Sequence, residues 1–159
     1  MPDSSITDAL VTAEYLTQVA ETTVTDVSNI YGTEIACCNF GVQMFFRTLF
    51  NDNSLDGKVA NQMVQYWNGN PDQWEPILMS EAQDYANQGY FVVAGWENPS
   101  GASGHVVVVV PGEEEYSSSW GEYVPVVMDT GGGMRNPKQS ISISFGRNKK
   151  NQIVYFKYK

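Results

Sequence analysis

The sequence predicts an α+β fold in which N-terminal helices pack on an antiparallel β-sheet of about five strands. In the first half of the chain, apolar residues recur at spacings of three and four, which is typical of helices with one buried face. The second half is rich in β-branched and aromatic residues separated by Gly and Ser clusters, which is typical of strands with short connections. A chain of 159 residues can bury a sizeable core, so we expect one domain over residues 1–159.

The predicted helices are Thr7–Val24, Cys38–Phe50, Lys58–Trp67 and a fourth that begins at Ser80 and closes at Gly89. Turn residues at 29–32 follow the first helix. In the second helix, the apolar spacing gives a broad buried face. In the fourth, Gln83 stands three residues after Ser80, which predicts a capping box. The predicted strands are Tyr90–Trp96, His105–Val110, Tyr123–Met128, Ile141–Phe145 and Ile153–Tyr158.

Charge and hydropathy exclude several partners. The chain has 18 acidic and 9 basic residues and a net charge of −9, whereas phosphate binding needs clustered Lys and Arg. The one basic run, residues 147–150, is interpreted as a solvated turn. The longest apolar run, residues 106–111, is far shorter than a membrane span of about 20 residues. We therefore expect a monomer with no nucleic-acid partner and no membrane span.

The counts of reactive residues exclude a zinc cage. Structural zinc needs about four Cys or His ligands in spaced pairs, and this chain has one His and two adjacent Cys. We expect neither a metal nor a cofactor. A bridge between neighbouring cysteines strains the backbone, so Cys37 and Cys38 are interpreted as thiols. If a histidine acts as a base, it is His105.

The N-terminus gives little indication of location. Residues 1–12 lack the basic start and apolar stretch of a secretory signal. A cytosolic protein, a removed leader and export without a signal all stay open.

Cys38 is the candidate nucleophile because it opens a predicted helix. A helix N-terminus offers free backbone N–H groups and a partial positive charge, which stabilise a thiolate. The alternative is a small buried hydrophobic residue, the commonest fate of a free cysteine. Cys37 precedes the helix and is expected to pack or to cap it. Helix phase puts Cys38 on the side of Val42 and Phe45, where the sheet should dock.

His105 and Asp129 are the candidate partners of this cysteine. His105 follows the Gly-rich segment 101–104 and opens a strand of five valines. A histidine at the mouth of a buried strand can meet a cysteine at a helix tip, as a Cys–His pair requires. Asp129 ends the predicted strand Tyr123–Met128 and could orient the imidazole. A structural histidine and a turn aspartate before glycines are the alternatives.

Taken together, these motifs resemble a known superfamily. Cys38-Asn39 opening an apolar helix and Gly104-His105-Val106 opening a strand resemble the papain-like NlpC and CHAP cell-wall peptidases. The helix that ends in Gly89 and leads into a strand also fits. Phage-type and secretion-system-delivered peptidoglycan amidases are similar. The resemblance covers roughly residues 30–131, with the two motifs 67 positions apart (105 minus 38).

The resemblance implies a papain-like fold with Cys38 as nucleophile and His105 as base. The third residue of this superfamily is polar and lies on the strand after the histidine, where we choose Asp129. An oxyanion hole would combine the backbone N–H of the nucleophile with an upstream polar residue, for which Tyr31 is the candidate and a core tyrosine the alternative. The predicted cleft residues are Asn39, Trp96 and Trp120, with core or rim packing as the alternative for the two tryptophans.

The resulting prediction is a cysteine amidase or peptidase that hydrolyses an amide bond in peptidoglycan stem peptides through a thioester. Such an enzyme would be secreted, periplasmic or delivered, with peptidoglycan peptide as substrate and an immunity or inhibitor protein as partner. Two alternatives are a papain-fold modifier of proteins, acting as deamidase or acyl transferase, and an inactive binding module. The choice among the N-acetylmuramoyl–L-Ala amide, the γ-D-Glu–diamino acid bond and a crosslink peptide stays open.

Overall fold

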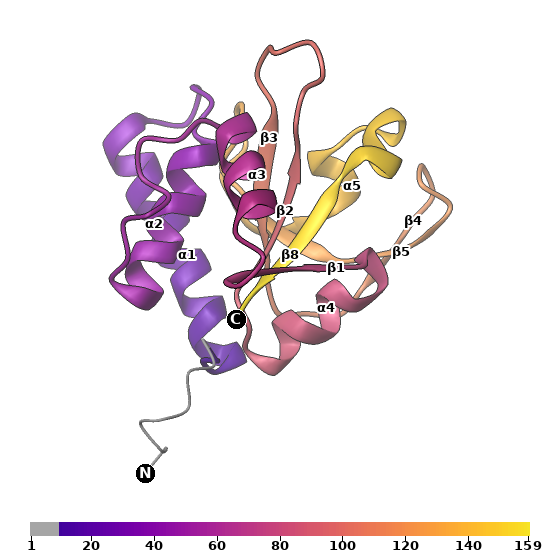
Figure 1. Ribbon diagram of the computed structural model, residues 1–159, viewed down its shortest axis with the longest axis horizontal. Helices are drawn as coiled ribbons and strands as arrows, with labels where there is room; N and C mark the ends of the chain where they lie inside the picture. The colour runs from indigo at the N-terminus through magenta and orange to yellow at the C-terminus, as the bar shows by residue number, and fades with distance from the viewer. Residues whose placement is uncertain (1–9) are drawn as a thin grey trace.

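A computed structural model describes residues 10–159 and shows an α+β fold (Figure 1). The helices are α1 (Ala13–Tyr31), α2 (Cys38–Phe50), α3 (Ala60–Gly69), α4 (Met79–Gln88), α5 (Ile141–Ser144) and the 3-10 helix η1 (Arg147–Gln152). The strands are β1 (Trp74–Ile77), β2 (Val92–Trp96), β3 (His105–Val109), β4 (Glu115–Ser117), β5 (Glu122–Val124), β6 (Val126–Asp129), β7 (Asn136–Ser140) and β8 (Val154–Tyr158).

The main sheet has six strands in the order β1-β8-β2-β3-β6-β7, and every neighbouring pair is antiparallel. Strands β4 and β5 form a separate two-stranded sheet. At the centre, β2 and β3 pair with Trp96 opposite His105. The antiparallel α+β class is confirmed, but the prediction of about five strands was too low.

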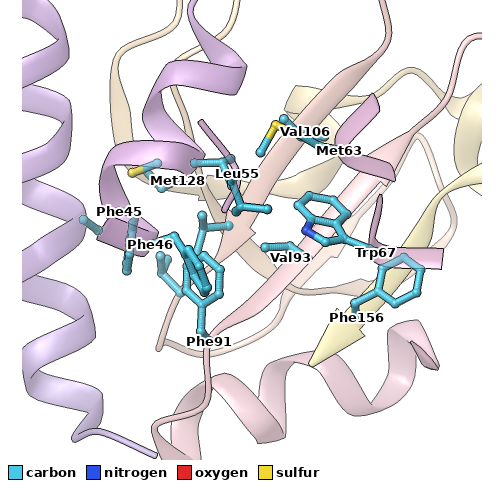
Figure 2. Packing of buried hydrophobic residues seen from close by; sticks show 14 of the residues in the cluster. Phe45, Phe46, Leu55, Met63, Trp67, Phe91, Val93, Val106, Met128 and Phe156 are labelled. Carbon is cyan, nitrogen blue, oxygen red and sulfur yellow. The ribbon is translucent and has the colours of Figure 1, made fainter. Parts of the chain in front are cut away.

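The alternation of side chains along the central strands divides the core into two layers. Val106 and Val108 pack with α1, α2 and α3 on one face of the sheet, while Val107 and Val109 pack with α4 and α5 on the other. Figure 2 shows the first layer, where Phe46 lies against Phe91 with ring centroids 5.4 Å apart. Burial of β3 on both faces explains its unbroken run of valines.

The predicted strand Ile141–Phe145 was wrong, because this segment begins with the short helix α5. The Ser140 side chain accepts a hydrogen bond from the backbone N–H of Ser142 and caps the helix start. Ile141 and Phe145, four residues apart, are buried on one side, and Ile143 is exposed. The β-branched and aromatic residues that predicted a strand therefore belong to one helical turn and its C-cap.

Three strands lay outside the predicted set: β1, β4 and β7. Strands β1 and β7 form the two edges of the main sheet and contain Pro76 and Pro137. Proline is tolerated at an edge because it lacks an N–H for a further ladder, but it weakens the strand signal in a sequence. The predicted strand Tyr123–Met128 is interrupted at Pro125, which separates β5 from β6.

Two helix predictions need correction. For the predicted helix Thr7–Val24, residues 7–9 lie outside the described residues, and α1 continues through the predicted turn to Tyr31. It ends at Gly32, whose positive φ of 80° suits glycine and whose N–H bonds to Ser28.

The fourth helix, α4, is capped differently from the prediction. Glu81, not Gln83, accepts from the N–H of the N-cap residue Leu78. Gln83 is buried instead. Its Nε2 donates to the carbonyl of Val110, the residue after β3, and its Oε1 accepts from the N–H of Val126, the first residue of β6.

Helix α2 matches its predicted bounds, Cys38–Phe50, and α3 falls within two residues of its prediction. Within residues 10–159, none of the helices has the length and apolar character needed to cross a membrane.

Candidate functional site

Cys38 is the first residue of α2, and Cys37 is the N-cap residue before it. Cys37 is fully buried and its side chain makes no capping bond, whereas Cys38 is half-buried and lines a cleft. The backbone of Cys37 is fixed to Thr130, because its N–H donates to the Thr130 carbonyl (3.1 Å) and its carbonyl accepts from Thr130 Oγ1 (2.8 Å). The nucleophile candidate thus stands at a helix N-terminus held against the end of β6.

His105 and Asp129 come from neighbouring strands and meet at the same end of the sheet. His105 opens β3, Asp129 closes β6, and His105 Nε2 lies 2.9 Å from Asp129 Oδ2. Asp129 is fully buried, and its Oδ1 accepts from the Gly131 N–H at 2.7 Å. A carboxylate held in this way orients the imidazole.

The environment of His105 favours the imidazolium form. Burial alone lowers the pKa of His105, but hydrogen bonding and charge interactions with Asp129 and Cys38 outweigh it and raise that pKa from 6.5 to about 9. Because Nε2 faces Asp129, Nδ1 is the ring nitrogen left for Cys38. The structure thus brings Cys38, His105 and Asp129 together in the predicted order.

The cleft in front of Cys38 and His105 has a volume of about 410 Å³. The remaining lining residues are all uncharged and mostly small: Ala36, Asn39, Val59, Ala60, Asn61, Gly101, Ala102, Ser103, Gly104, Gly131 and Gly132. A ligand bound beside the sulfur would therefore meet backbone groups and short neutral side chains.

Two glycines of this lining are needed for space. A Cβ atom added at Gly131 would clash with Cε1 of His105 and lie 2.9 Å from its Nδ1. A Cβ atom added at Gly104 would clash with Oδ1 of Asn61 and with the Trp96 carbonyl oxygen. From the sequence both glycines were interpreted only as loop residues. Their closeness to His105, Asn61 and the Trp96 carbonyl depends on the tertiary fold.

Asn61, near the start of α3, is a further residue that the sequence analysis missed. Its Nδ2 donates to the Ala102 carbonyl (2.9 Å), and its Oδ1 accepts from the Asn98 N–H (2.9 Å). One side chain thus fixes the loop that precedes His105. No local sequence pattern indicates this, because the partners are about forty positions away.

Of the other predicted site residues, Asn39 lines the cleft, and its Nδ2 donates to the Lys58 carbonyl at 3.2 Å. Tyr31 does not line it: the ring stacks on Phe40 with centroids 4.7 Å apart and planes 11° apart. Because α1 runs on to Tyr31, this residue belongs to the helix and not to the approach to Cys38. The groups that remain able to donate hydrogen bonds beside Cys38 are the free N–H groups at the start of α2.

The two tryptophans also lie outside the lining. Trp96 pairs with His105 in the sheet, but its Nε1 donates to Gln152 and Lys149 lies over its ring, so η1 covers it. Trp120 is 5% exposed and belongs to the second core layer. Both tryptophans therefore agree with the alternative of core or rim packing.

Over residues 10–159, no group of three or more His, Cys, Asp or Glu side chains is arranged to hold a metal ion. No protein-family model matches the chain, and a search of curated proteins finds no match.

Proposed function

We propose that this protein is a cysteine hydrolase of the papain-like NlpC/CHAP type, acting as an amidase or peptidase on peptidoglycan stem peptides. The observation that carries the proposal is the convergence of Cys38 and His105 on one cleft, with the buried Asp129 behind the imidazole. A helix that presents the cysteine beside a strand that presents the histidine supports the papain-like assignment.

The chemistry follows from the charge state of the pair. With the pKa of His105 near 9, the imidazolium is the favoured form at neutral pH and can stabilise a Cys38 thiolate. The thiolate attacks the amide carbonyl, and N–H groups at the start of α2 stabilise the oxyanion. His105 then gives its proton to the leaving amine, which leaves a thioester on Cys38.

Hydrolysis of the thioester completes the cycle. His105, now neutral, takes a proton from a water molecule as the oxygen of that water attacks the thioester carbonyl. The C–S bond breaks, the carboxylic acid leaves, and the sulfur departs as thiolate beside the reprotonated imidazole. Asp129 keeps the ring in place throughout and stabilises its charged form.

The lining of the cleft favours small, uncharged groups next to the scissile bond. Apart from the catalytic pair, the lining holds no ionisable side chain, so a substrate carboxylate would have no cationic partner there other than His105 itself. Of the three stem-peptide bonds considered, those flanked by alanine suit the lining better than a bond whose neighbouring D-Glu carries a free carboxylate.

The test is digestion of purified peptidoglycan, with the released muropeptides identified by mass spectrometry. We expect cleavage by the wild type and none by Cys38→Ala or His105→Ala. Cys37→Ala is the matched control, because Cys37 is buried outside the cleft, and it should retain cleavage. Circular dichroism confirms the fold of each variant.

A second measurement separates the alternatives. Iodoacetamide at neutral pH should label Cys38 rapidly, and His105→Ala should slow this labelling. Rapid labelling without cleavage of any muropeptide would favour the protein modifier, a deamidase or acyl transferase with the same Cys–His chemistry. Slow labelling of Cys38 in the wild type would reject the catalytic proposal and leave a binding module.

A further inference from the structure

The side chain of Arg135 joins the segment before the nucleophile to the segment after the buried acid. On one side, Nε and Nη2 donate to the Gly32 carbonyl (3.0 and 2.9 Å), and Nη2 also donates to the Ile35 carbonyl (2.8 Å). On the other side, Nη1 donates to the carbonyls of Thr130 (2.8 Å) and Met134 (2.7 Å). A single planar guanidinium therefore spans two loops that are about a hundred residues apart in the sequence.

The same guanidinium reaches the base of α2. Nη2 of Arg135 lies 3.6 Å from Sγ of Cys37, the N-cap residue. Two further bonds between Cys37 and Thr130 lie at this junction: Cys37 N–H to the Thr130 carbonyl, and Thr130 Oγ1 to the Cys37 carbonyl. Cys37 is directly followed by Cys38, and Thr130 is directly preceded by Asp129. The junction thus lies one residue from both catalytic candidates.

We propose that Arg135 is a positioning residue that sets the distance and direction between the Cys38 sulfur and the His105 ring. This inference rests on the proposed function. Asp129 holds His105. Arg135 joins the Thr130 carbonyl, next to Asp129, to the Ile35 carbonyl and the Cys37 sulfur, just before Cys38, so the two halves of the ion pair move as one unit. The planar fork of five N–H donors is what allows one side chain to hold carbonyls on both loops.

The partners of Arg135 distinguish this role from a surface ion pair. Within residues 10–159, Arg135 forms no salt bridge with a carboxylate, and its donors go to backbone carbonyls. The guanidinium therefore lies beside the N-terminus of α2 without a carboxylate partner among the described residues. The cations at the junction are Arg135 and His105, and the carboxylates are the buried Asp129 and the exposed Glu34, which lies between the Gly32 and Ile35 carbonyls in the sequence. The two cations both favour an anionic sulfur.

The experiment measures the rate of Cys38 alkylation across a range of pH in the wild type, Arg135→Gln and Arg135→Lys, with the label located by tandem mass spectrometry. We expect Arg135→Gln to slow alkylation at neutral pH by about a hundred-fold, the loss typical of a 1 Å displacement at a reacting centre. Its labelling should recover only at higher pH. Arg135→Lys keeps the charge but not the fork, and should recover only a small part of the rate.

Hydrolysis gives a second readout. The Arg135 variants should lower kcat and leave KM nearly unchanged, because the opposite side of the cleft is held by Asn61 and not by Arg135. Arg47→Gln is the matched control, since Arg47 pairs with Asp56 at the surface, and it should behave as the wild type.

The outcomes are distinguishable from failure of the proposed function. Slow Cys38 labelling in the wild type would reject the proposed function itself. A reactive wild type with equally reactive Arg135→Gln, or with full recovery in Arg135→Lys, would overturn the positioning role. If Arg135→Gln does not fold, Arg135→Lys alone decides the test, because lysine keeps the aliphatic stem and the charge but loses the planar fork. A rate equal to that of the wild type in Arg135→Lys would overturn the inference.

Discussion

The two sides of the cleft are built in opposite ways. We call the side formed by the start of α2 and residues 129–135 the catalytic wall, after the proposed function, and the side formed by residues 59–61 and the loop 98–104 the substrate wall. The catalytic wall is cross-linked by the side chains of Asp129, Thr130 and Arg135. The substrate wall is largely exposed and is tied by Asn61.

This difference indicates how one small cleft can hold Cys38 and His105 in fixed positions while the loop 98–104 on its other side stays easier to displace. The hydrogen bonds of Asp129 and Thr130 are buried and those of Arg135 are charge-assisted, so together they resist displacement and the ion pair keeps its geometry. The loop 98–104 is mostly exposed, and its hydrogen bonds to α3 come from the Asn61 side chain, so it opens at lower free-energy cost. Changes in the catalytic wall should therefore lower kcat, and changes in the substrate wall should mainly raise KM.

The largest effect is expected from Gly131→Ala in the catalytic wall. The new methyl group would clash with Cε1 of His105 and push the ring away from Cys38, lowering kcat at least about a hundred-fold. Gly133→Ala is a matched control, since a Cβ atom there meets only the Thr33 carbonyl oxygen at 3.9 Å. Kinetics on muropeptides compare the two variants, and equal activity would mean that His105 does not occupy a confined position.

Asp129→Asn should have the next largest effect. Asp129 is the largest of the influences that raise the pKa of His105, so the neutral amide should lower that pKa and deplete the imidazolium at neutral pH. We expect kcat to fall on the order of a hundred-fold, at the lower end of the range of general acid–base catalysis. NMR titration of the single histidine measures the pKa directly. A histidine that still titrates near 9 in this variant would contradict the assignment.

The same pair predicts a pH-dependent stability. Because folding raises the pKa of His105 from 6.5 to about 9, its contribution is fully present below pH 6.5 and is lost as the pH rises through about 9. The shift corresponds to about 3 kcal/mol at most. Urea unfolding on both sides of this window should show the loss in the wild type and a smaller one in His105→Gln. Equal losses would assign the effect to other groups.

The sequence predicts the catalytic wall better than the substrate wall, for a physical reason. Cys38, His105 and Asp129 each stand at the end of a regular element, and element ends carry local signals such as a Gly-rich lead or a change of hydropathy. Arg135 and Asn61 act on backbone carbonyls and amides of remote loops, which no spacing or composition indicates.

The two wrong predictions, for Tyr31 and for the segment Ile141–Phe145, also have a physical reason. Tyr31 was chosen as the upstream polar residue that the resemblance implies, but α1 extends to it and its ring stacks on Phe40. The segment Ile141–Phe145 was predicted as a strand because it is rich in β-branched and aromatic residues, but its apolar residues Ile141 and Phe145, four positions apart, also fit one turn of a helix. In each case tertiary packing selected between two local structures that the sequence allows equally.

A moderate effect is expected from Asn61→Ala in the substrate wall. Loss of both amide bonds should release the loop 98–104 and raise KM several-fold, with a smaller change in kcat. Asn61→Asp is a useful comparison, because it keeps the acceptor for the Asn98 N–H and loses the donor to Ala102. Steady-state kinetics separate the two parameters, and a fall in kcat alone would place Asn61 with the catalytic wall.

The smallest effect is expected from Trp120→Phe, which tests the limit of the cleft. Trp120 is buried in the second core layer, and its Nε1 has no hydrogen-bond partner among the described residues. Phenylalanine loses some packing but removes a buried donor that costs about 1 kcal/mol, so the free energy of unfolding should change little. Activity should stay within about two-fold of the wild type, the range of a substitution remote from the reacting groups. Urea unfolding and muropeptide kinetics measure both, and a raised KM with unchanged stability would extend the substrate wall to Trp120.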